Sequence, residues 1–436
     1  MRTYVSTHAL TQSLTKSIKE TAMKEFTGIE YLAIDLANHY GLDKELFEDR
    51  IQWVKDNWSN LEKFADKADA PFLYKKAVIN IRRVAQGLPS GHMVALDATC
   101  SGIQIMSAIT GCIKGATATG LIDPDVRADA YTTTQEVMNE ILGYAGDDAL
   151  MIARGEVKRA VMTSTYGSKK VPKDVFGEGE LLDTFYQAAE EVAEGAFNLL
   201  DDLMETWKPF ALVHEWVLPD GHEVKVKVMD TVEKRLEIDE LGHYQMTAVY
   251  QVNQGKKKGV SNVANVIHSL DAYLLRCMIR RCNYDARLVQ RVSDTITAEL
   301  LRRGIEDTRL TEMNEKVAHH YKLYVQTNML DTVMIYHINH ESVQSLPSYY
   351  LRKLNNLLAR LQEYKPFQIE SIHDAFMCHA DNCNRMRYWY KEIMAEFAES
   401  TILEFIFKTM LDESCMYPKY QDDLGDLIRQ SNYAIC

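Results

Sequence analysis

The stretch VALDATCSGIQ, residues 94–104, carries the strongest structural signal in this chain. Its first residues are apolar and lead directly to Asp97, and a polar turn that contains Gly102 leads into a second apolar run. An apolar strand, a glycine-containing turn and a helix are typical of such a pattern. The sequence therefore predicts strand, turn and helix over residues 92–113, with the strand ending on Asp97.

We call residues 94–104 the first frame. A second frame of the same form is IESIHDAF, residues 369–376, in which an apolar stretch leads to Asp374. Residues 367–379 are predicted to form a hairpin with His373 and Asp374 at its tip. Two carboxylates delivered by strand ends can share two divalent ions, the arrangement that phosphoryl and nucleotidyl transfer uses. Asp97 and Asp374 are therefore the first candidates for a metal-dependent site.

A basic helix lies between the two frames. Arg154, Lys158, Met162 and Tyr166 are four residues apart, so a helix would place them on one stripe. Arginine and lysine suit the phosphates of a nucleoside triphosphate, Lys158 could protonate a leaving pyrophosphate, and Tyr166 could stack near a base or sugar. On its own this helix is better explained as an exposed basic surface. With an aspartate frame on either side, the order is typical of a template-dependent polymerase.

The net charge of −13 is opposite to what a protein that follows phosphates needs. Positive charge must then be local or come from a partner. One local source is the segment 158–173, which holds five cations and no carboxylate, and another is Lys256-Lys257-Lys258. Runs this short are usually solvated loops, so only their position beside the motifs gives them weight.

The eight cysteines form no Cys-x-x-Cys pair, so their spacing predicts reduced thiols in a cytosol rather than zinc ligands. The apolar run 93–113 is about long enough for a membrane span, but it contains Asp97 and Gln104, which a bilayer disfavours. We expect a cytoplasmic protein without a membrane anchor (in the host cytoplasm, if a phage encodes it).

The length of 436 residues predicts two or three subdomains in an α+β fold that is mainly helical. Residues 1–90 are expected to be helical, including an amphipathic helix over 42–64. A helix over 121–144 should open at Asp123-Pro124. Period-two patterns predict a hairpin around Pro219-Asp220-Gly221 and another over 232–252. Helices are expected again over 263–282, throughout 284–365, and from the last hairpin to the end of the chain.

These motifs resemble those of the single-subunit, phage-type RNA polymerases of bacteriophages and mitochondria. The first frame resembles their Asp-(Gly/Ala)-(Ser/Thr)-Cys-Ser-Gly-Ile-Gln motif, and the helix resembles Arg-x3-Lys-Arg-x2-Met-x3-Tyr-Gly. The last frame resembles His-Asp-Ser-Phe, with Ala375 in place of serine. The similarity runs from about residue 25 to the end, apart from 284–365.

The resemblance implies a role for each matching residue. Asp97, Asp374 and the backbone carbonyl of Ala98 would hold two Mg²⁺ ions. Arg154 and Lys158 would bind the triphosphate. The remaining matches would line the nucleotide site or contact the hybrid and primer: Tyr131 in the active site, Tyr166 with Gly102 at the sugar, His268 against the new base pair, and His373 beside the second aspartate.

The resemblance also implies a right-hand palm and fingers without the thumb and N-terminal domain. The expected parts are a helical palm-side region 1–90, palm 91–122, fingers 123–262, a palm helix 263–283, a helical insertion 284–365, and a palm hairpin with a C-terminal foot 366–436. The region after Trp216 resembles the one that bears the promoter-specificity loop. We therefore expect the catalytic subunit of a heterodimeric phage RNA polymerase. It would act with a DNA template, an RNA transcript, ribonucleoside triphosphates and a second subunit.

Two alternatives remain open. A palm-type DNA polymerase would place a glutamate five residues after the first aspartate, where this chain has Gly102. A non-catalytic nucleic-acid-binding scaffold of the same fold would be favoured if either aspartate were missing, and neither is. His268 and Tyr131 also have a simpler interpretation, as interior residues of their helices.

Overall fold

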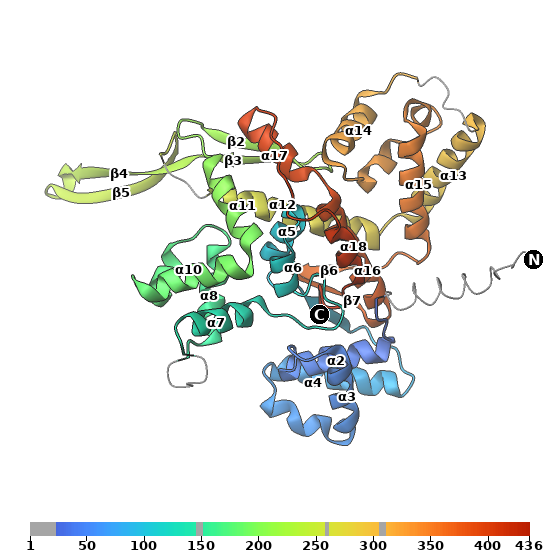
Figure 1. Ribbon diagram of the computed structural model, residues 1–436, viewed down its shortest axis with the longest axis horizontal. Coiled ribbons are helices and arrows are strands. Elements are labelled where there is room, and N and C mark those ends of the chain that lie inside the picture. The colour runs from blue at the N-terminus through green and yellow to red at the C-terminus, as the bar shows by residue number, and fades with distance from the viewer. Residues whose placement is uncertain (1–22, 145–150, 258–260, 305–310) are drawn as a thin grey trace, which may run out of the picture.

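The computed structural model describes residues 23–144, 151–257, 261–304 and 311–436, and it is mainly helical with three small sheets (Figure 1). The fold class predicted from the sequence, α+β with mostly helices, is confirmed. The expectations for residues 1–22 and for Lys258 lie outside the described residues.

The central sheet has three antiparallel strands in the order β1 (Met93–Asp97), β7 (Ala375–His379) and β6 (Glu370–Ile372). Asp97 is paired with Ala375, so the strand from the first frame lies directly beside the hairpin from the second. Both predicted elements are confirmed, with Asp374 in the turn between β6 and β7. The two frames, which are far apart in the sequence, thereby bring Asp97 and Asp374 to the same end of the sheet.

The helix α5 (Ser101–Thr110) follows β1 and is buried along its whole length. It packs against α11 (Glu194–Glu205), α12 (Ser261–Cys282) and α16 (Cys383–Glu399). The side chain of Gln104 donates to the carbonyls of Thr119 (3.0 Å) and Ala434 (2.9 Å) and accepts from the Tyr390 hydroxyl (2.6 Å). The glutamine of the first frame therefore joins α5 to α16 and to the end of the chain.

The N-terminal part is helical, as expected, but the helix predicted over 42–64 is wrong in its extent. The helices are α2 (Gly28–Tyr40), α3 (Phe47–Asp56), the 3₁₀ helix η1 (Trp58–Lys67) and α4 (Pro71–Ala85). The break falls at Asn57, whose side-chain amide donates to the Trp53 carbonyl at 2.9 Å. An asparagine that bonds to its own backbone competes with continuation of the helix.

Residues 113–205 form α6 (Ile113–Ala118), α7 (Ala130–Ile141), α8 (Arg154–Ser164), α9 (Lys170–Phe176), α10 (Glu180–Val192) and α11. The prediction that a helix opens at Asp123-Pro124 is wrong. The Asp123 carboxylate accepts from the Asp125 N–H in a turn, and α7 begins only after Asp129, whose carboxylate accepts from the Tyr131 N–H. Helix α8 also stops at Ser164, so Tyr166 follows its end.

Both predicted hairpins are confirmed: β2 (Val213–Val217) with β3 (Glu223–Lys227), and β4 (Met229–Ile238) with β5 (Tyr244–Asn253). The short turn η2 (Asp239–Leu241) closes the second. The described residues of 284–365 are mainly helical, as expected. They form a lobe of α13 (Ala286–Arg303), α14 (Glu315–Thr327), α15 (Ser348–Gln362) and the turns η3 (Thr332–His337) and η4 (Ser342–Ser345) (Figure 1).

The C-terminal part contains η5 (Ala380–Asn382), α16, α17 (Ile402–Leu411) and α18 (Leu424–Gln430). The expectation of helix to the end of the chain is wrong for the last residues, which are extended beside β1. The Cys436 N–H donates to the Asp97 carbonyl (3.0 Å), and the Asp97 N–H donates to the Cys436 carbonyl (3.3 Å). The free edge of β1 provides these partners, because its other edge is occupied by β7.

All eight cysteines are free thiols. No helix in the described part of the chain combines the length and the apolar character that crossing a bilayer requires.

Candidate active site

The two aspartates that the sequence singled out line one cavity of about 360 Å³. Asp97 ends β1, and Asp374 lies in the β6–β7 turn, where its carbonyl accepts from the Ala98 N–H at 3.3 Å. Ala98 borders the same cavity. The structure thus brings together all three residues expected to hold metal, although their role as ligands stays a prediction.

The backbone is strained on both sides of this carboxylate pair. Cys100 and His373 both have a φ of 55°, a left-handed conformation that residues other than glycine rarely adopt. Such conformations cost free energy, and they persist where the surrounding structure fixes them, often at functional sites. His373 itself is exposed, and its predicted contact with primer or hybrid stays a prediction.

The carboxylates lie close enough to influence each other. Although Asp97 is open to the cavity, the walls that surround it and the charge of Asp374 raise its pKa to about 6. The Ala98 N–H, Arg127 and Lys158 act in the opposite direction. Burial and the charge of Asp374 also raise the pKa of Asp271, on α12, to about 6. Asp271 does not line the cavity, but the charge of Asp374 acts on it; sequence reasoning gave it no role although it stands three residues after His268.

Helix α8 presents one face to this cavity, as its spacing predicted. Arg154, Lys158 and Met162 line the cavity, whereas Val157 and Val161 are buried on the other side of the helix. The Arg154 guanidinium and the Lys158 ammonium lie 5.5 Å and 5.6 Å from the centre of the Tyr131 ring. Tyr131 is buried, as an interior residue would be, and it also lines the cavity. Its hydroxyl is hydrogen-bonded to the Cys100 thiol.

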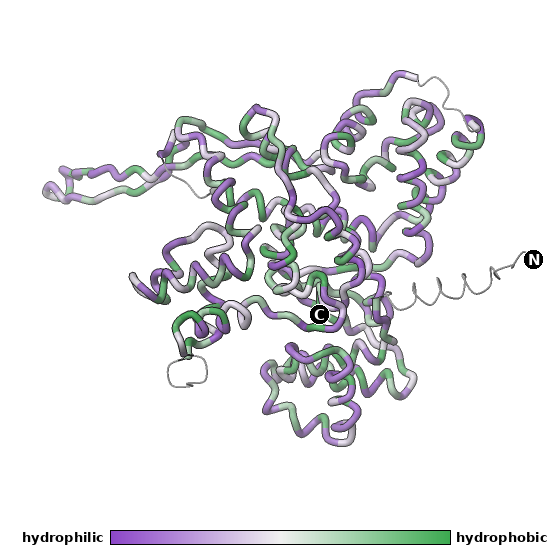
Figure 2. The backbone as a smooth tube through the Cα atoms, in the orientation of Figure 1, coloured by the Kyte–Doolittle hydropathy of each residue, from purple (hydrophilic) through white to green (hydrophobic). Residues whose placement is uncertain are grey.

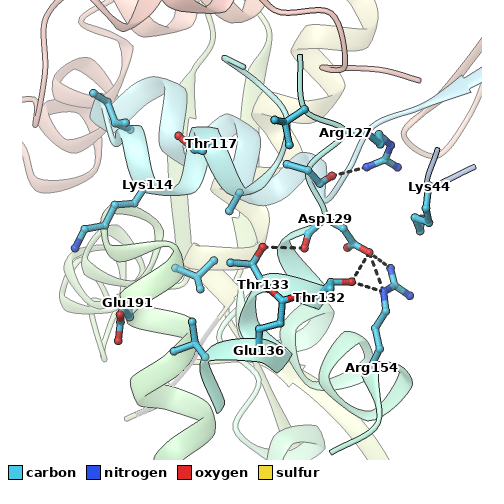
Figure 3. Close-up of a pocket in the computed structure, with 16 residues that line it drawn as sticks. Lys44, Lys114, Thr117, Arg127, Asp129, Thr132, Thr133, Glu136, Arg154 and Glu191 are labelled. Atoms are coloured by element: carbon cyan, nitrogen blue, oxygen red, sulfur yellow. Dashed lines mark hydrogen bonds and ion pairs between the residues drawn. The ribbon is translucent and has the colours of Figure 1, made fainter. Parts of the chain in front are cut away.

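No pattern in the sequence indicates that Arg154 has a partner within the chain. Its Nε donates to Asp129 Oδ2 (2.8 Å) and to Thr132 Oγ1 (3.1 Å), as Figure 3 shows. Burial opposes the charged form of Asp129, but the hydrogen bonds and charge of Arg154 outweigh it, so the pKa of this carboxylate lies below its usual value. Asp129 therefore both caps α7 and fixes the orientation of Arg154.

A larger cavity of about 950 Å³ lies behind this ion pair (Figure 3). The two cavities share four wall residues: Lys44, Arg127, Asp129 and Arg154. Arg127 donates from Nη1 to the Ala128 carbonyl, and its buried Nε has no partner among the described residues. No carboxylate of the described chain forms an ion pair with Arg127, which leaves its charge directed toward the site.

Lys44 reaches the wall from the loop between α2 and α3, and its ammonium lies 2.7 Å from the Asp43 carboxylate. The fully buried Arg50 holds this loop through hydrogen bonds to the carbonyls of Asp43 (2.9 Å) and Glu45 (2.7 Å). Neither Lys44 nor Arg127 belongs to a motif, so the sequence offered no signal for them.

Tyr166, Gly102 and His268 meet beside the cavity. The Tyr166 ring stacks on the His268 ring at 4.7 Å with an interplanar angle of 4°. A Cβ atom at Gly102 would lie 2.9 Å from the Tyr166 hydroxyl, so a side chain there would displace the tyrosine. His268 is exposed, so its interpretation as an interior histidine is wrong.

The donor atoms of the site suit a hard divalent cation. Two carboxylates with adjacent backbone oxygens are the ligands that Mg²⁺ prefers. Within the described residues, the cluster whose three side chains could reach one ion is Glu237, Asp239 and His243, which is exposed at the tip of the β4–β5 hairpin. It is separate from the Asp97–Asp374 pair.

A small antiparallel sheet with two carboxylates, faced by a cationic helix, agrees with the resemblance to template-dependent polymerases that the sequence motifs suggest. A family model described as DNA-dependent RNA polymerase matches residues 24–191. That segment matches this family, and the chain is similar to DNA-directed RNA polymerases of phages and mitochondria.

Similar proteins include the DNA-directed RNA polymerase of Pseudomonas phage phiKMV, 27% identical over 44% of this chain and 29% of its own length. The mitochondrial DNA-directed RNA polymerase of Schizosaccharomyces pombe is 22% identical over 86% of this chain and 31% of its own length. T7 RNA polymerase of Escherichia phage T7 is 25% identical over 57% of this chain and 38% of its own length. The matches cover less than half of each of these relatives.

The raised pKa of Asp97 leads to a prediction about stability without divalent ions. An unfolded aspartate ionises at about pH 3.9, whereas folded Asp97 ionises at about pH 6. The folded state is therefore penalised increasingly between about pH 4 and pH 6 and by a constant amount above that. Asp97→Asn should raise the melting temperature at pH 7.5 in EDTA, and the gain should disappear at pH 3.5.

The control for this measurement is Asp49→Asn, which removes an exposed carboxylate from α3. Equal effects of the two substitutions at pH 7.5, or a gain for Asp97→Asn that persists at pH 3.5, would contradict the electrostatic interpretation.

Proposed function

We propose that this chain carries the catalytic site of a DNA-templated RNA polymerase that works by two-metal nucleotidyl transfer. The observation that carries the proposal is the meeting of Asp97 and Asp374 in one cavity with the cationic face of α8. The relatives named above support the choice of RNA synthesis as the activity.

The reaction would be attack of an RNA 3′-hydroxyl on the α-phosphate of a ribonucleoside triphosphate paired to template DNA. A new phosphorus–oxygen bond forms, and the bond to pyrophosphate breaks. Asp97, Asp374 and the Ala98 carbonyl would hold two Mg²⁺ ions. When bound, these ions would lower the pKa of the hydroxyl and neutralise charge on the leaving phosphate.

The cations around the cavity would bind the triphosphate and stabilise the leaving pyrophosphate. Lys158 would give a proton to the departing pyrophosphate, since it faces the cavity and no carboxylate of the described residues forms an ion pair with it. Arg154 would bind phosphate oxygens through the guanidinium N–H groups that are not bonded to Asp129. Arg127 and Lys44 add positive charge from the wall that the two cavities share.

The contact between Gly102 and Tyr166 supports ribose as the sugar. The glycine leaves the Tyr166 hydroxyl in place as a polar partner for the sugar, with His268 stacked behind it and His373 on the primer side. A glutamate at position 102, as in palm-type DNA polymerases, would collide with Tyr166. That observation disfavours the DNA-polymerase alternative. The presence of both carboxylates disfavours a non-catalytic scaffold.

The proposed partners are a DNA template, an RNA transcript and ribonucleoside triphosphates. A second protein subunit stays a prediction, and its support is the net charge of −13 on a chain that has to hold nucleic acid. The palm, fingers and insertion boundaries and the cytoplasmic location also stay predictions.

Replacing either aspartate tests the proposal directly. Asp97→Asn or Asp374→Asn should reduce nucleotide addition by roughly a thousandfold, about 4 kcal/mol of transition-state stabilisation, because a metal ligand is lost. The measurement is extension of a primed template in the preparation in which the unaltered chain is active. Glu370→Gln changes an exposed carboxylate on β6 and should have no effect. Activity within tenfold of the unaltered chain in either aspartate variant would remove the assignment.

Sugar selection depends on the Tyr166 hydroxyl. Tyr166→Phe should lower the preference for ribonucleotides over deoxyribonucleotides by about tenfold or more, because a site that loses a polar partner no longer rejects the analogue that lacks the matching group. The measurement is the ratio of kcat/KM for the two nucleotides. Tyr186→Phe, on α10, serves as the control. An unchanged ratio for Tyr166→Phe would argue against this role.

Arg127 should contribute to triphosphate binding. Arg127→Ala should lower kcat/KM for nucleotides by about tenfold, since a charge-assisted hydrogen bond contributes about 1.5–3 kcal/mol. Lys114→Ala is the matched control, because Lys114 lies on the wall of the larger cavity, paired with Glu194. If both variants behave alike, Arg127 does not contact the substrate.

A further inference from the structure

A cluster of titratable side chains lies in the wall of the candidate active site, and the reaction proposed above does not use it. Asp35 and His39, one turn apart on α2, both border the cavity that Asp97 and Asp374 share. Polar residues lie among apolar ones along α2, and both colours are visible on this helix in Figure 2. Asp35 is buried, whereas 19% of the His39 side chain is exposed. Of the two, the histidine is therefore the one that can meet a molecule in the cavity.

The Asp35 carboxylate is held from three directions. His92 Nε2 lies 2.7 Å from Asp35 Oδ2, and the Ala95 N–H donates to Oδ1 at 3.3 Å. His39 Nε2 is more distant, 3.5 Å from Oδ2. Ala95 stands two residues before Asp97 on β1, so the carboxylate also holds the strand that carries the site. The cluster thus joins α2 to the catalytic strand.

The surroundings of His92 favour its neutral form. Its Nδ1 is buried and has no hydrogen-bond partner among the described residues. A protonated ring would leave an unsatisfied N–H at this atom, which costs free energy in a buried position. The short contact with Asp35 is then explained by one ring proton on Nε2. The negative charge of Asp35 is left for His39 to balance.

The charge state of His39 depends on what the cavity contains. Burial lowers the pKa of His39 below its ordinary value; Asp35 opposes this, whereas His92, before β1, and Lys76, on α4, reinforce it. The ring is therefore mainly neutral at neutral pH in the free protein. A polyphosphate in the cavity would add negative charge beside the ring and favour the imidazolium. Binding of such an anion would then take up a proton.

The fixed charges on this side of the cavity also call for that proton. Lys44, in the loop after α2, is paired with Asp43, and both residues border the cavity. With Asp35 they amount to one cation and two carboxylates, a net negative charge that repels phosphate. Protonation of His39 cancels this charge and places an N–H donor on the cavity wall.

We propose that protonated His39 contacts the phosphates of the incoming nucleotide and the pyrophosphate that leaves, with Asp35 and His92 as positioning residues. The inference rests on the proposed polymerase function and adds a residue to its site. The contribution of His39 to binding is complete below the pKa of the free ring. It is lost as the pH rises through the higher pKa of the ring in the complex. Pyrophosphate is therefore held more tightly in acid and released more readily in base.

Inhibition of nucleotide addition by pyrophosphate tests this contact. The inhibition constant is measured with the primed template and the preparation in which the unaltered chain is active. His39→Gln should raise the constant about tenfold near pH 6, where a charge-assisted hydrogen bond is lost, and should leave it unchanged at about pH 8.5. Pyrophosphate and Mg²⁺ titrate alike in both samples, so the ratio of the two constants at each pH isolates the protein. His340→Gln removes an exposed histidine of the helical lobe and should give a ratio of one at both pH values.

Proton uptake supplies a second measurement. Calorimetry near pH 7, in two buffers of different ionisation enthalpy, should show that the unaltered chain takes up more protons with pyrophosphate than His39→Gln does, by at most about one. An equal ratio of inhibition constants at both pH values would indicate a merely structural role for His39. That result, a ratio of one throughout, or equal proton uptake would overturn the proposal.

Asp97→Asn in the same assay keeps the two assignments apart. If Asp97→Asn loses nucleotide addition while the His39→Gln ratio does not change with pH, the phosphate contact is rejected and the polymerase assignment stands. If Asp97→Asn remains active, the polymerase assignment itself fails.

Discussion

The structure depends on holding two negative charges side by side. The pairing of β1 with β7 holds Asp97 and Asp374 close together, and so does the hydrogen bond from the Ala98 N–H to the Asp374 carbonyl. Burial, and after it the neighbouring charge of Asp374, disfavour ionisation of Asp97 and raise its pKa. The cations that surround this pair, on α8 and on the loops before α3 and α7, compensate for a charge that the sheet imposes.

The arrangement of those cations separates fixed from available charge. Asp129 and Thr132 hold Arg154 in one orientation, whereas Lys158 and Arg127 have no carboxylate partner within the described residues. The cavity is therefore lined by both fixed and available cations. A site of this kind can orient an anion through its fixed members and neutralise changing charge through the others.

The sequence predicted the elements that local pattern determines. Three apolar residues before Asp97 and a glycine after it specify strand, turn and helix, and the four-residue spacing on α8 specifies its cavity face. The start of the helix predicted over 121–144 was misplaced because Asp123-Pro124 resembles a helix N-cap. The actual N-cap is Asp129, whose carboxylate accepts from the Tyr131 N–H and also from its tertiary partner Arg154. Asn57 likewise ended a helix that the apolar pattern alone would have continued.

The parts of the site that could not be predicted come from loops. Lys44, Arg127 and Asp129 reach the cavity because Arg50 and the packing of α7 against α8 place their loops there, and no local spacing encodes that approach. The exposure of His268 likewise could not be predicted from local spacing. Its helix has an interior composition around it, but the tyrosine that stacks on it arrives from the end of α8.

The pairing of β1 with β7 also determines when the site can form during folding. Residues 98 to 373 lie between the two aspartates along the chain, and closing a loop of that length is entropically costly and slow compared with forming helices. During synthesis the helices α6 to α11 and the helical lobe can begin to fold before Asp374 has left the ribosome. The site around Asp97 and Asp374 is therefore among the last parts of the molecule to assemble, and an interrupted chain that has completed these helices still lacks one of the two charges.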